Sequence, residues 1–210
     1  EMVKNLVRHF RDENTGGVSG DKVIVSTGEG ESAYWKYENA VKNYEYKALG
    51  TVLSSDNVSF ALRKSIFTDE CPPIIRHDFW LSLYIAGKGY NIIYEKNAKV
   101  YEEYNPTPEE DFNRKIRVIL GGMQAVFLFP RLLFHFKNFP VAFQLWSHKI
   151  LRWFASISAL FLFAVNLPLA KTLFFQIALL CQCAFYSAAA IGILFPAARK
   201  YRLIKVISYF

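Results

Sequence analysis

Two uncharged stretches dominate the C-terminal part of this 210-residue chain: 153-WFASISALFLFAVNLPLA-170 and 172-TLFFQIALLCQCAFYSAAAIGILFPAA-198. Only Lys171 separates them. The hydrocarbon core of a bilayer is about 30 Å thick, and about 20 apolar helical residues cross it. The second stretch has this length outright, and Ile150 and Leu151 extend the first. The sequence therefore predicts two transmembrane helices within residues 149–198, with a pair of buried helices in a soluble core as the alternative.

Charge is unevenly distributed along the chain. All 18 acidic residues precede Phe112, whereas basic residues continue towards the C-terminus. The outer flanks of the uncharged stretches are basic, with Lys149, Arg152, Arg199, Lys200, Arg202 and Lys205. The positive-inside rule assigns these flanks, together with residues 1–122, to the cytoplasm. We therefore expect a multi-pass protein of the cell membrane with a cytoplasmic N-terminal domain.

The segment 123–148 is apolar and aromatic, but prolines and polar residues interrupt it. No window in it is long enough to span a bilayer. We expect interfacial amphipathic helices, with Arg131 and Lys137 at lipid headgroups and His148 as a polar tip. Basic charge scattered through apolar sequence favours a lipid bilayer as partner and disfavours nucleic acid. Residues 199–210 are expected to form a cytosolic basic segment that leads to a truncated further helix.

The first 122 residues predict a mixed α/β domain. Strands are expected at 22–26, 58–62, 91–94 and 98–101, where short β-rich apolar runs occur. The glycine-rich 16-GGVSG-20 predicts a turn before the first strand. Apolar residues at helical spacing predict helices over 31–49 and 78–86, and a third helix is expected to begin near Pro108.

The candidate site rests on three charged residues, because the chain has no phosphate-binding loop, dinucleotide fingerprint, zinc-protease motif or nucleophile elbow. Asp78 begins a predicted helix after the loop 71-CPPIIRH-77. Backbone N–H groups at a helix N-terminus keep a carboxylate ionised, which suits a general base or an ordinary helix cap. Arg114 and Arg117 share one helix face, so they either converge on one anion or form a basic patch facing the membrane.

The order of these pieces resembles the C-terminal two-thirds of a membrane-bound family 2 glycosyltransferase of the bacterial polysaccharide-synthesis type, which has a GT-A catalytic domain. The resemblance rests on 16-GGVSG-20, 34-YWKYE-38, 57-NVSFALRKSIF-67, 77-HDFWL-81, 88-KGY-90 and 114-RKIRVILGGMQ-124. It implies a partial GT-A-like (Rossmann-like) cytosolic domain, a nucleotide-sugar donor and a glycan or lipid-linked acceptor.

The resemblance also implies roles for individual residues. Asp78 looks like the base that deprotonates the acceptor hydroxyl for an inverting attack on the anomeric carbon. Arg114 and Arg117 would steady the leaving nucleotide diphosphate. His77 stands at a substrate-binding position where the family has an acidic residue, and Val118 stands where processive relatives have tryptophan.

The DxD metal motif of this family occurs nowhere in the chain, so no metal ligand is assigned to it. We expect a C-terminal fragment, with the nucleotide-binding strands and DxD motif before Glu1. The full-length enzyme would then use a divalent metal, Mg²⁺ or Mn²⁺, and the fragment alone would be inactive. The alternative, prompted by His77 and Val118, is a non-catalytic membrane partner of a polysaccharide synthase complex.

Overall fold

A computed structural model describes most of the chain. The described residues are 1–25, 29–53, 58–67, 77–103, 108–134, 139–195, 198, 201 and 204, and for 29–34, 77, 108 and 156 the description is confined to the backbone. The chain divides into two compact units, the N-terminal unit Glu1–Arg152 and the C-terminal unit Trp153–Phe210. The N-terminal unit is mixed α/β, as the sequence predicted, and the C-terminal unit is helical.

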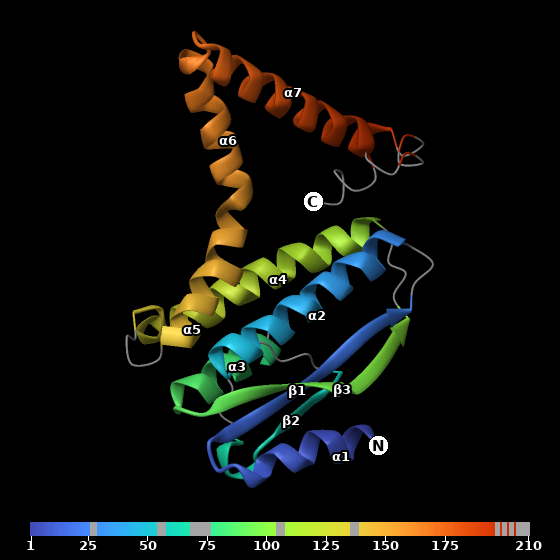
Figure 1. The fold of residues 1–210 in the computed structure, drawn as a ribbon, viewed down its shortest axis with the longest axis vertical. Coiled ribbons are helices and arrows are strands. Elements are labelled where there is room, and N and C mark those ends of the chain that lie inside the picture. Colours follow the sequence, from blue (N-terminus) through green and yellow to red (C-terminus); the bar gives the residue numbers. More distant parts are fainter. Residues whose placement is uncertain are drawn as a thin grey trace. The chain divides into compact units, whose positions relative to one another are not determined.

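A small mixed sheet forms the centre of the N-terminal unit (Figure 1). Its middle strand is β1 (Thr15–Val25). The short β2 (Phe60–Leu62) pairs with β1 in the antiparallel direction, and β3 (Asn91–Glu103) pairs with it in parallel. The parallel pair requires a long crossover connection, which the helices between β1 and β3 supply.

The predicted turn at 16-GGVSG-20 is wrong, because these residues lie inside β1. Their glycines serve close packing within the strand. A Cβ atom on Gly16 would lie 2.6 Å from Cβ of Tyr90, and one on Gly20 would lie 2.5 Å from the carbonyl oxygen of Ala98. Glycine in a strand interior often marks such a close approach.

The two strands predicted at 91–94 and 98–101 form one strand, β3. Their interruption is a shift of register, since Gly20 pairs with Glu95 and the next residue, Asp21, pairs with Lys99. An irregularity of this kind bends a strand and leaves the extra residues unpaired. Ala98 lies within it and is fully buried.

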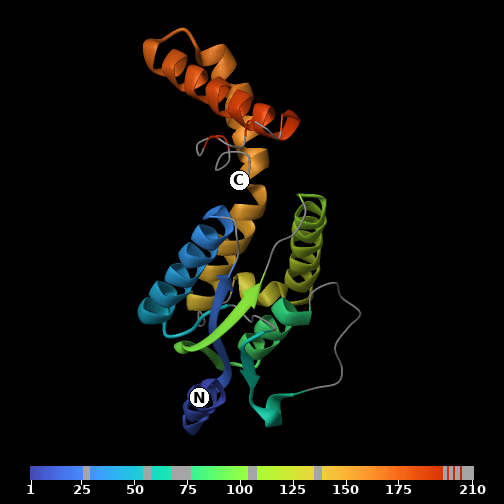
Figure 2. The ribbon, with the colours of Figure 1, turned by 90° about the vertical axis from the view of Figure 1, so that its right-hand side faces the viewer.

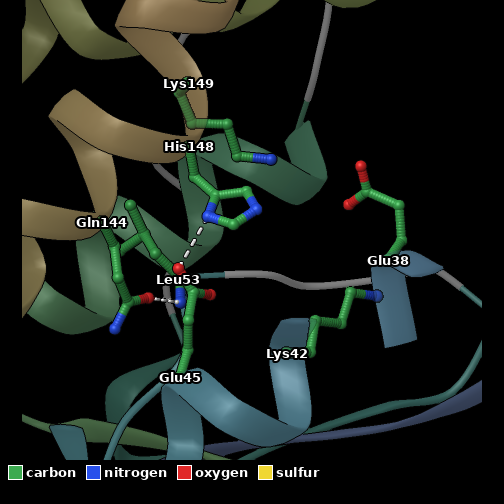
Figure 3. Close-up of a pocket in the computed structure, with 7 residues that line it drawn as sticks. All are labelled: Glu38, Lys42, Glu45, Leu53, Gln144, His148 and Lys149. Carbon is green, nitrogen blue, oxygen red and sulfur yellow. Dashed lines mark hydrogen bonds and ion pairs between the residues drawn. The ribbon is translucent and has the colours of Figure 1, made fainter. Parts of the chain in front are cut away.

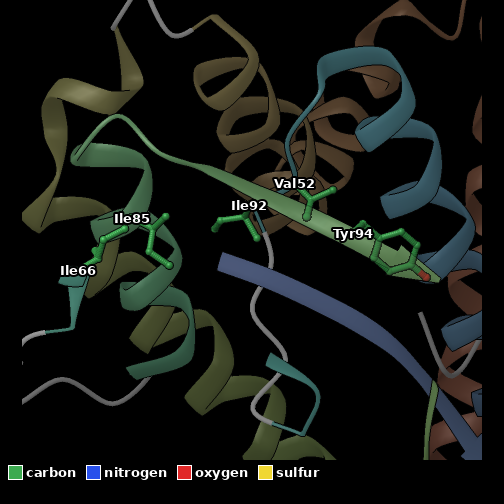
Figure 4. Packing of buried hydrophobic residues seen from close by; sticks show 5 residues of the cluster. All are labelled: Val52, Ile66, Ile85, Ile92 and Tyr94. Carbon is green, nitrogen blue, oxygen red and sulfur yellow. The ribbon is translucent and has the colours of Figure 1, made fainter. Parts of the chain in front are cut away.

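Helices cover the sheet on both sides (Figures 1 and 2). The short α1 (Met2–Val7) lies on one side, followed by the 3-10 turn η1 (Arg8–Arg11). On the other side lie α2 (Glu29–Leu49) and α3 (His77–Gly87). The prediction of these two helices from apolar spacing is confirmed to within two residues at each end. A cluster of buried hydrophobic residues packs α3 against the sheet. Figure 4 shows its members, which are Val52, Ile66, Ile85, Ile92 and Tyr94.

The long helix α4 (Pro108–Leu128) begins at the predicted proline and packs against α3. It runs past residue 123, where the sequence predicted a separate interfacial segment. The 3-10 turns η2 (Lys64–Ile66) and η3 (Pro130–Leu133) lie in connections. The helix α5 (Phe139–Gln144) continues into the π-helix η5 (Leu145–Ile150). Lys137 lies outside the described residues.

The C-terminal unit contains a helix that can cross a membrane. This helix is α7 (Leu173–Leu194), which has a mean hydropathy of 2.0 over its best window. The apolar stretch before it, which includes α6 (Leu151–Leu169), reaches the length and hydropathy of a span only as two helical segments that meet at a bend, Phe139–Ala155 and Ile157–Leu169. The part of the chain that the structure describes thus supports one membrane-crossing helix outright, whereas the sequence predicted two.

Polar groups connect α6 and α7. The amide Nδ2 of Asn166 donates to Oε1 of Gln182 at 3.0 Å, and the hydroxyl of Tyr186 donates to the carbonyl of Ala159 at 2.9 Å. Such bonds hold apolar helices together where little hydrophobic driving force exists between them. Of the predicted basic segment 199–210, only residues 201 and 204 are described.

Candidate functional site

Asp78 lies in the first turn of α3, as predicted. The helix is anchored by Leu83 and Ile85, which are fully buried against the rest of the unit. Asp78 itself is 9% exposed, so only a small part of the residue is reachable from solvent. The side chain of His77 and the loop 71–76 lie outside what the structure describes.

The first turn of α3 lies beside a charged pocket. The Nζ atom of Lys149 sits 5.2 Å from the centre of the Phe79 ring, and Lys149 also lines the pocket. Figure 3 shows the lining residues, which are Glu38, Lys42, Glu45, Leu53, Gln144, His148 and Lys149. With a volume of about 20 Å³ the pocket has room for one water molecule, so it is not the binding site of a sugar.

The buried side chain of Gln144, the last residue of α5, joins that helix to the connection that follows α2. Its Oε1 accepts the backbone N–H of Leu53 at 2.6 Å, and its Nε2 donates to the carbonyl of Thr51 at 2.8 Å. Gln144 is 1% exposed. One side-chain amide therefore satisfies two buried backbone groups, which would otherwise remain without partners at a cost of about 1–3 kcal/mol each.

Two contacts with acidic side chains extend this connection along α2. Nδ1 of His148 lies 2.7 Å from Oε1 of Glu45, and the guanidinium group of Arg152 contacts Glu38. Gln144, His148 and Arg152 recur every four residues, and this spacing places them on one face of a helical segment. We call these three residues and their partners the polar seam. His148 is therefore half-buried against the carboxylate of Glu45, where the sequence suggested a polar tip in the membrane interface.

Arg114 contacts an acidic residue of its own helix. Its Nη2 donates to Oδ1 of Asp111 at 3.0 Å, and Nζ of Lys115 lies 3.1 Å from Oδ2 of the same carboxylate. Burial acts to raise the pKa of Asp111, but hydrogen bonds from Arg114 and Lys115 outweigh it, so the pKa lies below its usual value. Arg117, one turn further on, is exposed.

A ring contact links α3 to the C-terminal end of α4. The ring of Trp80, near Asp78 in α3, lies 6.4 Å from the ring of Phe129, which directly follows α4. Arg117 precedes Phe129 by twelve residues, or about 18 Å along a helix axis. The C-terminal end of α4 is therefore packed against α3, and Arg114 and Arg117 lie in the N-terminal half of α4.

Among the described residues, no group of three histidine, cysteine, aspartate or glutamate side chains could hold a metal ion. These residues therefore do not fit the divalent metal that the resemblance implies.

Comparison with protein families found no matching family model. Comparison with curated proteins found no significant match. Function is therefore inferred from the arrangement of the chain's own residues, above all Asp78 in its helix and the apolar helix α7.

Proposed function

We propose that this chain forms part of an inverting glycosyltransferase that acts at the cytoplasmic face of the cell membrane. It would transfer a sugar from a nucleotide-sugar donor to a glycan or a lipid-linked acceptor. The observation that carries the proposal is the position of Asp78, a nearly buried carboxylate in the first turn of an eleven-residue helix packed on a mixed sheet. This is the position that the sequence resemblance gives to the catalytic base.

The proposed reaction requires one carboxylate that accepts one proton from the acceptor hydroxyl. The acceptor hydroxyl would transfer its proton to an Oδ atom of Asp78 while the hydroxyl oxygen forms a bond to the anomeric carbon. The bond from that carbon to the nucleotide diphosphate breaks on the opposite side, which inverts the configuration. The carboxylate must be ionised and within hydrogen-bond reach of the hydroxyl.

The leaving diphosphate needs positive charge as the bond breaks. Arg114 and Arg117 are the proposed source. In this structure the guanidinium of Arg114 contacts Asp111, so a bound diphosphate would have to replace that carboxylate as its anionic partner. Lys149 is a further cation, already located beside the first turn of α3 through its contact with Phe79.

We further propose that α6 and α7 both cross the membrane, with their basic outer flanks in the cytoplasm. Support comes from the apolar length of α7, from the hydrogen bond between Asn166 and Gln182, and from the basic flanks. A 22-residue helix such as α7 extends about 33 Å, enough for the hydrocarbon core.

Release of nucleoside diphosphate from nucleotide sugars tests the proposal. The complete gene product that contains this chain is purified in membranes and supplied with a panel of nucleotide sugars and a lipid extract as acceptor. The proposal expects acceptor-dependent release with at least one donor. Failure of every donor, in membranes that synthesise the native glycan, would contradict it.

A non-catalytic membrane partner of a polysaccharide synthase complex is the second candidate. The contact between Arg114 and Asp111, which engages the guanidinium group with a carboxylate of its own helix, favours it. The two candidates differ in one result. A non-catalytic partner would restore glycan synthesis in a deletion strain equally well with Asp78 or with asparagine at position 78.

A further inference from the structure

A second, larger depression lies at the corner between the ends of α3 and α4. Its volume is about 720 Å³, within the usual range of ligand-binding sites. One wall comes from the last turns of α3 and the turn that follows, and the other comes from the end of α4 and η3. It shares no lining residue with the pocket beside Asp78. We call it the corner groove.

The corner groove combines an apolar floor with positive charge. Leu128, Phe129 and Pro130 contribute apolar surface, while Lys88 and Arg131 are exposed on its lining. None of the described residues that line it is acidic. A groove with these properties suits a ligand that has one anionic end and one apolar end.

The surroundings of the corner groove favour a lipid surface. Phe127 at the end of α4 is 81% exposed, and Phe134 just after η3 is 68% exposed. Exposed aromatic rings next to basic residues are typical of protein segments at the membrane interface. The sequence supports the same reading, because no acidic residue occurs between Phe112 and Phe210.

We propose that the corner groove binds an anionic phospholipid. Lys88 and Arg131 contact the headgroup phosphate, and the first carbons of an acyl chain lie on the apolar floor. The positive lining selects an anionic lipid over a neutral one, and the floor selects an amphiphile over free phosphate. A soluble glycan is a poorer fit, because it would require many hydrogen-bonding side chains where this groove offers leucine, phenylalanine and proline. Lipid binding in the corner groove requires that the chain is attached to a membrane, but it does not require that the protein transfers sugars.

Photo-crosslinking tests this site in the complete chain. The protein is reconstituted in phosphatidylcholine vesicles that contain a small fraction of phosphatidylglycerol with a diazirine near the glycerol, and the labelled peptides are mapped by mass spectrometry. Labelling should concentrate on residues 84–89 and 128–132. Anionic lipid attraction contributes about a fivefold change in affinity per basic residue, so Lys88→Gln with Arg131→Gln should lower the apparent affinity about 25-fold.

The matched control is Lys64→Gln with Lys96→Gln, which removes the same charge from exposed lysines outside the groove. This control should leave the labelling unchanged. The inference is overturned if diazirine-bearing phosphatidylcholine labels the groove equally well, or if both charge-removing pairs reduce labelling alike. It is also overturned if inorganic phosphate competes as strongly as the lipid does, or if the groove crosslinks to a second copy of the chain.

Discussion

Nδ1 of His148 lies 2.7 Å from Oε1 of Glu45, which joins the helical segment before α6 to the helix α2. The two residues are about a hundred positions apart in the chain. Gln144 and Arg152 make the neighbouring contacts of the polar seam, to Leu53 and Glu38. The seam therefore fastens the segment that leads into the apolar helices onto α2 and the loop after it, and Lys149 of the same segment lies beside the first turn of α3.

The seam should contribute measurably to stability. Gln144→Ala removes the side-chain amide that bonds the buried N–H of Leu53 and the buried carbonyl of Thr51. We therefore expect a loss of about 1–3 kcal/mol in the free energy of unfolding. Thermal unfolding in detergent micelles measures this loss. Ser147→Ala is the control, because Ser147 is exposed on the same segment and its hydroxyl donates locally, to the carbonyl of Phe143. Equal melting temperatures for the two variants would show that the seam is not stabilising.

The stability of the N-terminal unit should fall in acid because of Glu95. Burial acts to raise the pKa of Glu95, but hydrogen bonds from His9, the Asn97 amide and Arg8 outweigh it, so its pKa lies below the ordinary 4.5. The unfolded state therefore binds more protons than the folded state in this range. The contribution is fully present above about pH 5 and disappears as pH falls through the lowered folded pKa.

Glu95→Gln should cost about 1.5–3 kcal/mol near neutral pH, since it removes hydrogen bonds to a charged group. The loss of stability on acidification should then be shallower in the variant than in the parent chain. Unfolding curves at a series of pH values measure both effects. The control is Glu103→Gln, at an exposed carboxylate of the same strand, which should lose stability on acidification as steeply as the parent chain does. An equally steep loss for Glu95→Gln would show that Glu95 is not the source of the pH dependence.

Gly20 should not tolerate a side chain. The Cβ atom of alanine would lie 2.5 Å from the backbone oxygen of Ala98, and backbone cannot yield as a flexible side chain does. We expect Gly20→Ala to destabilise the protein by about 1–3 kcal/mol, the usual cost of overpacking. Gly87→Ala is the control, because the nearest atom, on Phe129, is 3.6 Å from the new Cβ. Similar chemical denaturation midpoints for both variants would contradict this account of β1.

The two-span topology predicts that Lys171 and the N-terminal unit lie on opposite sides of the membrane. In a background without native cysteines, a membrane-impermeant maleimide added to intact cells should label Lys171→Cys. Lys96→Cys, at an exposed residue of the N-terminal unit, should react only after the cells are permeabilised. Labelling of both positions under the same condition would rule out the second span.

Local patterns in the sequence predicted the helices of this fold well and its strands less well. The spacing of apolar residues located α2 and α3 because one buried face is enough to define a helix. The glycines of 16-GGVSG-20 were misassigned to a turn, since only the facing atoms of Tyr90 and Ala98 reveal that they permit close packing. The register shift in β3 likewise depends on its partner strand.

In the candidate site, too, features set by neighbouring residues were predicted and features set by distant residues were missed. The helix-starting position of Asp78 was visible in the sequence, because it depends on the residues next to it. The polar seam was missed, although the four-residue spacing of Gln144, His148 and Arg152 was a usable signal. Its acidic partners, Glu38 and Glu45, lie about a hundred residues earlier, and local patterns do not pair residues over such a distance.

The most direct measurement concerns Asp78 in the complete gene product. Asp78→Asn keeps the size and the helix-capping capacity of the side chain but removes the base. The account predicts that acceptor-dependent release of nucleoside diphosphate falls by about 10²–10⁴-fold, the usual contribution of a general base, while the Kd of the nucleotide-sugar donor and the turnover of the Glu103→Gln control stay unchanged. Turnover by Asp78→Asn at the level of the parent enzyme would contradict it.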